Sequence, residues 1–542
     1  MLAIVANIYS LTIYFNLGQI MVNDFFLGFA GHAHTKNNLI LDPNSGRELR
    51  EKNSPEEAQR LTEAVLDKLE RDISNAGYDL KDVKLLILYL SYRGESEDQD
   101  RLLCESILKA IDNRFKGHTT GNQLRLIGHN TCGEIENEDL ELKEVSGIGH
   151  NGLSLLALVT NLPIGVGRTW GLRTAKEATE HGREMAHEAW VDFHQSTDLK
   201  EHLQKGKTLF VLAQGPTLIS SGWLHFLGEG ISNFVNSTHE ARISNVIGGG
   251  TGDDLSRGAR AFGHQFYGKL GKQSELKILD NEAVCALIPN LSEPSLGLDA
   301  TPTKRIGGSH IFHFDPVVEP QFIHVKRIDN LDARELYAKI VFDNEVQISR
   351  EKGLSIDEKE LFKSISEMEE IPHHPILGKY GFAFPFGNYA PVCPMKVRGQ
   401  DVEMLRPVRN YESSMAGYFV QVDPEMIQRG ARNVYSMLRE NRGFSENDVT
   451  FLVTCIVRRI IEMAAGCTKT EAEILKESFP STQVMGFLAS TELSFSHLLQ
   501  EPYVYNWSCW GITLRSVVNG REEAKRKKAL GIKGWLKGPT DE

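Results

Sequence analysis

Apolar runs of strand length recur along the chain, and each is followed by the same order of elements. Opening strands are expected at 83–90, 208–213 and 449–457, because these runs are largely apolar, as is typical of strands covered on both faces. A helix, a second strand and an outgoing strand follow each one. The helices are expected near 99–114, 222–233 and 468–478, the second strands at 124–127, 243–247 and 483–485, and the outgoing strands at 152–159, 283–288 and 509–514. The pattern predicts an α/β fold of multi-layer mixed sheets with internally repeated strand–helix–strand units.

Each second strand runs into a glycine turn that is followed by a carboxylate. The turns read GHNTCGEI, GGGTGDD and GFLASTEL, and their acids are Glu134, Asp253 and Glu492. Glycine permits positive φ and close backbone approach. Carboxylates and turn N–H groups together suit a small ligand that carries an amine or an acid, so we expect the turns to line a polar cavity. The alternative is that each acid accepts hydrogen bonds within its own turn.

Arg458 follows an apolar strand and can clamp a ligand carboxylate, with an internal ion pair to one of the three acids as the alternative. The predicted ligand-binding residues are Gly128, His129, Thr131, Gly133, Glu134, Gly249, Gly250, Asp253, Arg458, Gly486 and Glu492. No catalytic residue is assigned, because neither Thr131 nor Cys132 has a base that the sequence identifies. No metal site is assigned either, because the 18 histidines show no zinc-binding spacing.

Composition narrows the class of protein. Hydrophobic residues make up 41% of the chain and charged residues 24%, as in ordinary globular proteins. The net charge of −12 disfavours a nucleic-acid partner. Seven scattered cysteines without a CxxC pair favour a reducing compartment, so a cytoplasmic location is expected. Three interpretations of the apolar segment 1–22 stay open. Translation starts at Met21, so that the residues before it are not part of the protein, or the segment is a membrane anchor, or it is an added edge element. No other membrane contact is expected.

The order of these motifs resembles the FIST (F-box and intracellular signal transduction) family. The stretch HAHT, the turns GHNTCGEI and GGGTGDD, and the GVG turn before an Ala-rich helix resemble the N-terminal FIST region. VKRIDNLDARELYAKIV, HPILGKYG, VTFLVTCIVRR and GFLASTEL resemble the C-terminal region. The first turn has His129 where the family pattern often has Cys, and the third has Thr491 where Gly is expected.

The resemblance implies two FIST-type halves, at 23–290 and 316–520. Between them we expect a linker at 291–315. The second half contains a surface insertion at about 343–372, and a basic tail at 521–542 follows it. It also implies an intracellular sensory module that binds an amino acid or related metabolite and signals through a partner protein. Some family members are haem proteins that sense nitric oxide, so haem is one possible cofactor. A hydrolase or transferase that uses Glu134 or Cys132 is the enzymatic alternative.

Overall fold

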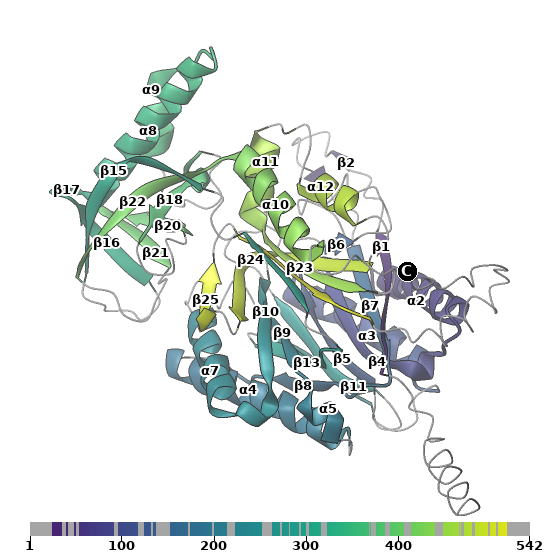
Figure 1. The fold of residues 1–542 in the computed structure, drawn as a ribbon. Helices are drawn as coiled ribbons and strands as arrows, with labels where there is room; N and C mark the ends of the chain where they lie inside the picture. Colours follow the sequence, from purple (N-terminus) through teal and green to yellow (C-terminus); the bar gives the residue numbers. More distant parts are fainter. Residues whose placement is uncertain are drawn as a thin grey trace, which may run out of the picture.

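Three units of the same topology form the body of the protein, and an inserted module projects from it (Figure 1). The computed structural model describes residues 24–516 with gaps. The gaps are 35–39, 42–47, 50–53, 92–95, 118–123, 132–133, 137–151, 172–173, 198–199, 214–222, 252–262, 271–273, 281, 292–293, 300–302, 316–321, 368, 370–375, 385–390, 406–412, 440–447, 466, 468–470, 480–482, 497–498 and 506–507. The predicted segment 1–22 and tail 521–542 lie outside the described residues, as do Gly133 and Asp253.

In each unit an edge strand, a helix, an opening strand, a second helix, a crossing strand and an exit strand follow one another. Unit 1 consists of β1 (Phe26–His34), α2 (Pro55–Asn75), β4 (Val83–Leu90), α3 (Glu97–Phe115), β5 (Leu124–Asn130) and β7 (Gly152–Thr160). Unit 2 consists of β8 (Gly165–Arg168), α4 (Ala175–Gln195), β9 (Lys207–Ala213), α7 (Trp223–Ser237), β10 (Ile243–Thr251) and β13 (Ala283–Pro289). Unit 3 consists of β14 (Ser295–Asp299), α10 (Pro424–Arg439), β23 (Val449–Cys455), α12 (Glu471–Ser478), β24 (Gln483–Ser496) and β26 (Cys509–Leu514).

The strand order across the sheet is the same in all three units: edge, exit, opening, crossing. The opening and crossing strands are parallel, and the other neighbours are antiparallel. A parallel pair needs a crossover connection, which the second helix of each unit supplies. The α/β fold and its repeated strand–helix–strand units, predicted from the sequence, are confirmed.

The body has four layers. The six-stranded sheet of unit 1 packs face to face on the ten-stranded sheet that units 2 and 3 share, and one apolar cluster joins them. Helices α2 and α3 cover the outer face of the first sheet. Helices α4 and α7, and then α10 and α12, cover the outer face of the second. The strands are therefore buried on both faces, which explains why their sequences are apolar throughout.

Helix starts in units 1 and 2 follow from local sequence. Ser54, Ser96 and Thr174 each stand before a helix, and each side chain accepts a hydrogen bond from a backbone N–H of the first turn. Acidic residues in those first turns complement the helix dipole. The capped helices α2, α3 and α4 then bury their apolar sides against the sheets.

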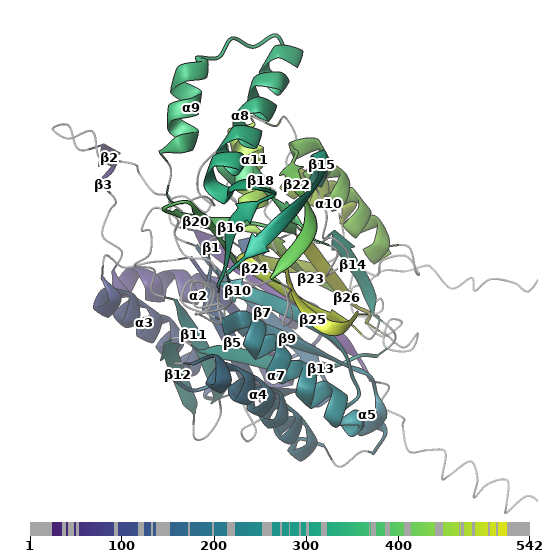
Figure 2. The ribbon, with the colours of Figure 1, turned by 90° about the vertical axis from the view of Figure 1, so that its left-hand side faces the viewer.

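The inserted module comprises residues 303–422 and interrupts unit 3 between β14 and α10. Its strands are β15 (Thr303–Phe314), β16 (Phe322–Ile328), β17 (Leu331–Asp332), β18 (Tyr380–Ala383), β19 (Pro391–Val392), β20 (Pro394–Arg398), β21 (Asp401–Leu405) and β22 (Ser414–Val422), and its helices are α8 (Ala333–Glu351) and α9 (Glu358–Ser366). It has its own aromatic core, with Phe312, Phe382 and Phe419 at its centre. In the turned view the module lies above the body, with α3 and α4 at the opposite end (Figure 2).

The predicted division into two halves with a linker at 291–315 needs correction. This segment contains β14, which pairs with β26 inside unit 3, and all of β15, which pairs with β22. The first part of unit 3 therefore precedes the inserted module, and the rest follows it. The predicted surface insertion at 343–372 contains the second half of α8 and all of α9, which project from the module (Figure 1).

The crossing strands link the units in a ring. β6 (Glu134–Glu136) follows β5 after three residues and pairs with β24 of unit 3. The second half of β24 pairs with β10 of unit 2. β11 (His264–Leu270), which follows β10, pairs with β5 of unit 1 and is flanked by β12 (Glu275–Asp280). Each unit thus lends a segment to the next, in the order 1 to 3, 3 to 2 and 2 to 1.

One glycine in each crossing strand makes room for the opening strand beside it. Gly128, Gly248 and Gly486 stand in register with Leu88, Val211 and Leu452. A Cβ atom at any of the three would lie closer than 3.0 Å to the carbonyl oxygen of its partner, a separation that real Cβ atoms essentially never show. Of the two properties of glycine considered from the sequence, positive φ and close backbone approach, these positions use the second: none of the three has positive φ. Space for the backbone is the physical reason for glycine here.

In each unit, the residues in register across the four strands form a row, which we call the glycine row. It begins at the crossing-strand glycine and ends on a second glycine in the edge strand. Through the exit strands, Gly31, Gly167 and Gly297 stand in register with the crossing-strand glycines. At these positions the Cβ would face backbone carbonyl oxygens of α2, α4 and α10. The glycine rows therefore allow helix and strand backbones to approach closely in all three units.

The remaining elements are short or join the units. They are β2 (Ile40–Leu41), β3 (Glu48–Leu49), α5 (Lys200–Gln204), α11 (Ile456–Ala464), β25 (Leu499–Tyr505) and the 3₁₀ turns Leu80–Asp82, His239–Ala241 and Leu377–Lys379. Within the described ranges, no helix combines the length and apolar character that crossing a bilayer requires.

The glycine rows give a stability prediction. Gly248→Ala and Gly486→Ala should each lower the free energy of unfolding by about 2 kcal/mol or more, because the new methyl group displaces a strand backbone that cannot yield cheaply. Gly117→Ala is the matched control, since no atom lies within 4 Å of a Cβ at that position. It should change stability by less than about 0.5 kcal/mol. Chemical denaturation checks all three, and equal effects at the three sites would contradict the packing role.

Candidate functional site

The three glycine–acid segments that the sequence predicts as turns converge on the ring of crossing strands. The prediction of turns needs correction, because GFLASTEL lies entirely within β24 and GGGT forms the end of β10. Glu134 stands in register with Phe487, next to Gly486. Glu492 stands in register with Gly249, and Gly250 with Thr491. The structure thus brings the backbones of the first, second and third turns together, although they are more than 100 residues apart in sequence. We call this meeting point the crossing centre.

Buried aromatic rings line one side of the crossing centre. The His129 ring lies 4.4 Å from the Phe487 ring and 5.1 Å from the Tyr89 ring, edge to face in both pairs. All three side chains are buried. The Nδ1 of His129 lies 2.8 Å from the carbonyl oxygen of Asn130 and therefore donates its hydrogen there. His129, Phe487 and Gly249 are equivalent, because each directly follows the row glycine of its unit.

Thr131 is buried at the end of β5, and its backbone N–H donates to the carbonyl oxygen of Leu90 at 2.9 Å. This bond extends the pairing of β4 and β5 into the turn. Thr131 therefore helps to set the direction in which the chain leaves unit 1 towards β6.

Sequence reasoning missed Gln265. It stands in register with His129, just as Glu134 does with Phe487 and Glu492 does with Gly249. Gln265 is fully buried, and its Oε1 accepts the Glu282 N–H at 3.2 Å. Its Nε2 is buried and has no hydrogen-bond partner among the described residues. The third equivalent position of the crossing centre therefore carries a carboxamide in place of an acid.

Tyr89 shares these properties with Gln265. Its hydroxyl is buried and likewise finds no hydrogen-bond partner in the described part of the chain. Burial raises the pKa of Tyr89 well above its ordinary value, so the hydroxyl stays neutral. Tyr89, His129 and Gln265 form one row across three neighbouring strands. Buried polar groups normally have partners, so two unmet groups in one row mark the place where a polar molecule can bind.

Arg458, predicted as a ligand clamp, is engaged within the protein. It is fully buried and bonds to Asp299 at 2.8 Å, to Glu471 at 3.0 and 3.3 Å and to the carbonyl oxygen of Ile427 at 3.1 Å. The alternative of an internal ion pair is the one observed, with partners other than the three turn acids. Asp299 and Ile427 flank the two chain connections of the inserted module, so Arg458 holds both connections to α12.

Arg515 makes a parallel set of contacts at the other end of the same elements. It bonds to Asp448 at 2.9 Å, to the Ser295 hydroxyl at 2.8 Å and to the carbonyl oxygen of Leu438 at 3.3 Å. Ser295 begins β14 and Leu438 lies in the last turn of α10. Two buried arginines therefore fix β14 against α10, one near the module and one far from it.

A buried acid, Glu462 of α11, adjoins the Arg458 cluster. Its Oε1 accepts the Glu471 N–H at 2.8 Å, and Arg459 lies 3.5 Å from its other oxygen. Burial, followed by the charge of Glu471, raises the pKa of Glu462 to about 7. This carboxyl changes its charge near neutral pH inside unit 3.

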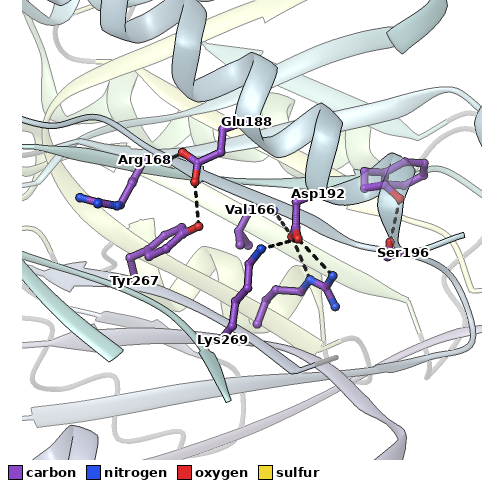
Figure 3. Close-up of polar contacts among 9 residues, drawn as sticks. Val166, Arg168, Glu188, Asp192, Ser196, Tyr267 and Lys269 are labelled. Atoms are coloured by element: carbon purple, nitrogen blue, oxygen red, sulfur yellow. Dashed lines mark hydrogen bonds and ion pairs between the residues drawn. The ribbon is translucent and has the colours of Figure 1, made fainter. Parts of the chain in front are cut away.

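A second polar cluster joins sheet and helix between units 1 and 2 (Figure 3). Both oxygens of Asp192 are engaged, by Arg125 at 3.0 and 3.3 Å, by Lys269 at 2.6 Å and by the Val166 N–H at 3.1 Å. Burial alone would raise the pKa of Asp192, but the hydrogen bonds and charges of Arg125 and Lys269 outweigh it and lower the pKa. Nearby, Glu188 accepts the Tyr267 hydroxyl at 3.0 Å. Both acids of this cluster are bonded to side chains of the protein itself, Asp192 to Arg125 and Lys269 and Glu188 to Tyr267. The cluster therefore fastens β5 and β11 to α4.

Metal binding has no support in the part of the chain that the structure describes. No group of three or more His, Cys, Asp or Glu side chains in these ranges is arranged to hold an ion.

The paired arginines allow a matched test. Arg458→Gln and Arg515→Gln should each destabilise the protein by about 3–5 kcal/mol, because each leaves buried carboxylate unpaired. Their local effects should differ. In hydrogen–deuterium exchange, the first variant should loosen the first turn of α10 and the bases of β15 and β22, and the second should loosen the last turn of α10. Identical exchange patterns in the two variants would contradict the assignment of Arg458 to the module connections.

Glu462 gives a pH prediction. Its pKa is higher in the folded than in the unfolded state, so the folded protein binds more protons, and stability falls as pH rises from about 4.5 to about 7. Glu462→Gln should remove this loss, leaving the variant about 1–3 kcal/mol more stable than wild type at pH 8 and nearly equal at pH 4.5. Thermal unfolding from pH 4.5 to 8 measures the effect. The exposed Glu473→Gln is the control, and a difference that is constant across pH would refute the explanation.

Comparison with known proteins gives little guidance. The chain matches no family model and no curated protein. Among solved structures it is similar to a cyanuric acid hydrolase from A. caulinodans, with 10% identity, 51% of this chain and 72% of that chain covered, and a TM-score of 0.24. A second cyanuric acid hydrolase, described as an evolutionary innovation by structural concatenation, shows 10% identity, 51% and 73% coverage and a TM-score of 0.24. Similarity this low assigns neither a fold family nor an activity.

Proposed function

We propose that this protein is a cytoplasmic sensory module that binds an amino acid or related small metabolite at the crossing centre and signals through a partner protein. The observation that carries the proposal is the row of Tyr89, His129 and Gln265, in which two buried polar atoms have no partner among the described residues. The resemblance of the turn motifs to the FIST family supports the sensory role.

The ring of crossing strands supplies a mechanism for sensing. Segments from all three units meet at the crossing centre, through β6 with β24, β24 with β10 and β11 with β5. A ligand bound there contacts several units at once, so its binding energy depends on how the units are arranged. It therefore favours one arrangement over others and shifts their populations. Because β14 and α10 of unit 3 flank the inserted module, such a shift also reaches the module.

A thermal-shift screen of amino acids and related metabolites on the full chain tests the proposal. A ligand at a hundred times its Kd should stabilise the protein by about 2.7 kcal/mol. Without ligand, Tyr89→Phe should be as stable as wild type or more stable by about 1 kcal/mol, because it removes a buried hydroxyl that lacks a partner. The same variant should lose most of the ligand-induced shift.

Tyr337→Phe is the matched control, since Tyr337 is a buried tyrosine of the inserted module, far from the crossing strands in sequence and in fold. It should keep the full ligand-induced shift. The proposal fails if no compound stabilises the wild type, or if Tyr89→Phe responds to an active compound as the wild type does.

A further inference from the structure

The three units place equivalent residues at the crossing centre, but one of the three differs chemically. Glu134, Glu492 and Gln265 each stand in register with the residue that follows a row glycine. Glu134 and Glu492 each lie six residues after the glycine of their own unit, whereas Gln265 lies seventeen residues after Gly248. Unit 2 therefore reaches the same position through a longer connection and delivers an amide there.

The orientation of the Gln265 amide follows from its one hydrogen bond. Only the oxygen of a carboxamide can accept the Glu282 N–H, so Oε1 points to Glu282 and Nε2 points elsewhere. That Nε2 is a donor without an acceptor among the described residues. The neutral hydroxyl of Tyr89, in the same row, can also donate. The polar atom that completes this side of the site is thus a hydrogen-bond acceptor.

Charge decides between the two common acceptors, a carbonyl and a carboxylate. The two long cationic side chains of β5 and β11, Arg125 and Lys269, are both bonded to Asp192. Arg168 of β8, the other described cation near Gln265, lies 3.6 Å from Glu282, so each of these three cations already faces an acid. A ligand carboxylate would add a further buried negative charge, and such burial is strongly unfavourable. A neutral carbonyl oxygen meets the same donors without that cost.

Resting on the proposed function, we infer that the ligand belongs to the related metabolites and not to the free amino acids: it is a carboxamide compound, neutral or cationic, without a free carboxylate. Its carbonyl oxygen accepts from Gln265 Nε2 and the Tyr89 hydroxyl. The rings of His129 and Phe487, which stand edge to face at 4.4 Å, give this side of the centre an aromatic wall, and a planar amide can stack on such a wall. Among amino-acid-related metabolites, this selects amides.

Matched probe pairs test the ligand class on the full-length protein. Nicotinamide and nicotinate, benzamide and benzoate, and L-alaninamide and L-alanine differ mainly at the group in question. Saturation-transfer NMR and calorimetric titration should show at least about tenfold tighter binding of the amide in a pair. Gln265→Glu should abolish that preference, because it replaces the donor by a carboxylate. Gln265→Met, which is neutral and similar in volume, should also abolish it and keeps the test valid if the acidic variant does not fold.

Gln421→Glu is the control for placing a carboxylate at a buried glutamine, since Gln421 lies in the inserted module and donates to the Tyr380 hydroxyl at 3.0 Å. It should keep the amide preference. Equal binding of amides and acids, or a preference that survives both Gln265 variants, overturns the ligand class. The proposed site still stands in that case if Tyr89→Phe weakens binding of the same probes. If no probe binds, this inference is overturned. If, in addition, no compound of the thermal-shift screen stabilises the protein, the proposed function is overturned as well.

Discussion

The close approach of opening and crossing strands at Gly128, Gly248 and Gly486 is the contact on which the rest of the body depends. Each glycine lets a strand backbone lie against the carbonyl oxygen of its neighbour, where any side chain would collide. That approach directs the crossing strand out of its own unit and into the next. Three such crossings close a ring, and the ring holds two sheets around one shared apolar core.

The ring also explains how a large module can be inserted into unit 3 without disrupting it. The insertion separates β14 from α10, yet both still pack in the places that their counterparts occupy in units 1 and 2. Gly297 in the row lets α10 approach β14, and the buried arginines Arg458 and Arg515 fasten the two elements at opposite ends. Local packing between β14 and α10 thus holds together two elements that shorter connections join in units 1 and 2.

Much of the fold follows from the sequence, because buried strands and amphipathic helices leave periodic signals. The opening strands at 83–90 and 208–213 agree with β4 and β9 to within one residue. Pairing between units is different: nothing in the residues of β6 or β11 indicates that their neighbours come from another unit. From the sequence, Asp253 was named as the acid of unit 2 because it follows the glycines of that unit. The residue of unit 2 that stands in register with His129 is Gln265. The sequence does not reveal this, because the connection from Gly248 to Gln265 is longer than its counterparts in units 1 and 3. Arg458 was named as a ligand clamp because it follows an apolar strand, and its partner Asp299 could not be identified because it lies in the segment predicted to be a linker.

The departures from equivalence among the three units locate the function better than their similarities do. Positions that serve packing are the same in every unit, as the glycine rows are. At the crossing centre the equivalent positions instead carry different residues. The residue after the row glycine is His129, Phe487 or Gly249. Its partner in register from the neighbouring unit is Gln265, Glu134 or Glu492, respectively. Packing alone gives no reason for a buried amide donor and a buried hydroxyl without partners, and natural proteins tolerate such groups chiefly where binding requires them. Repetition therefore built the scaffold, and differences among the repeats at its centre created an asymmetric polar site.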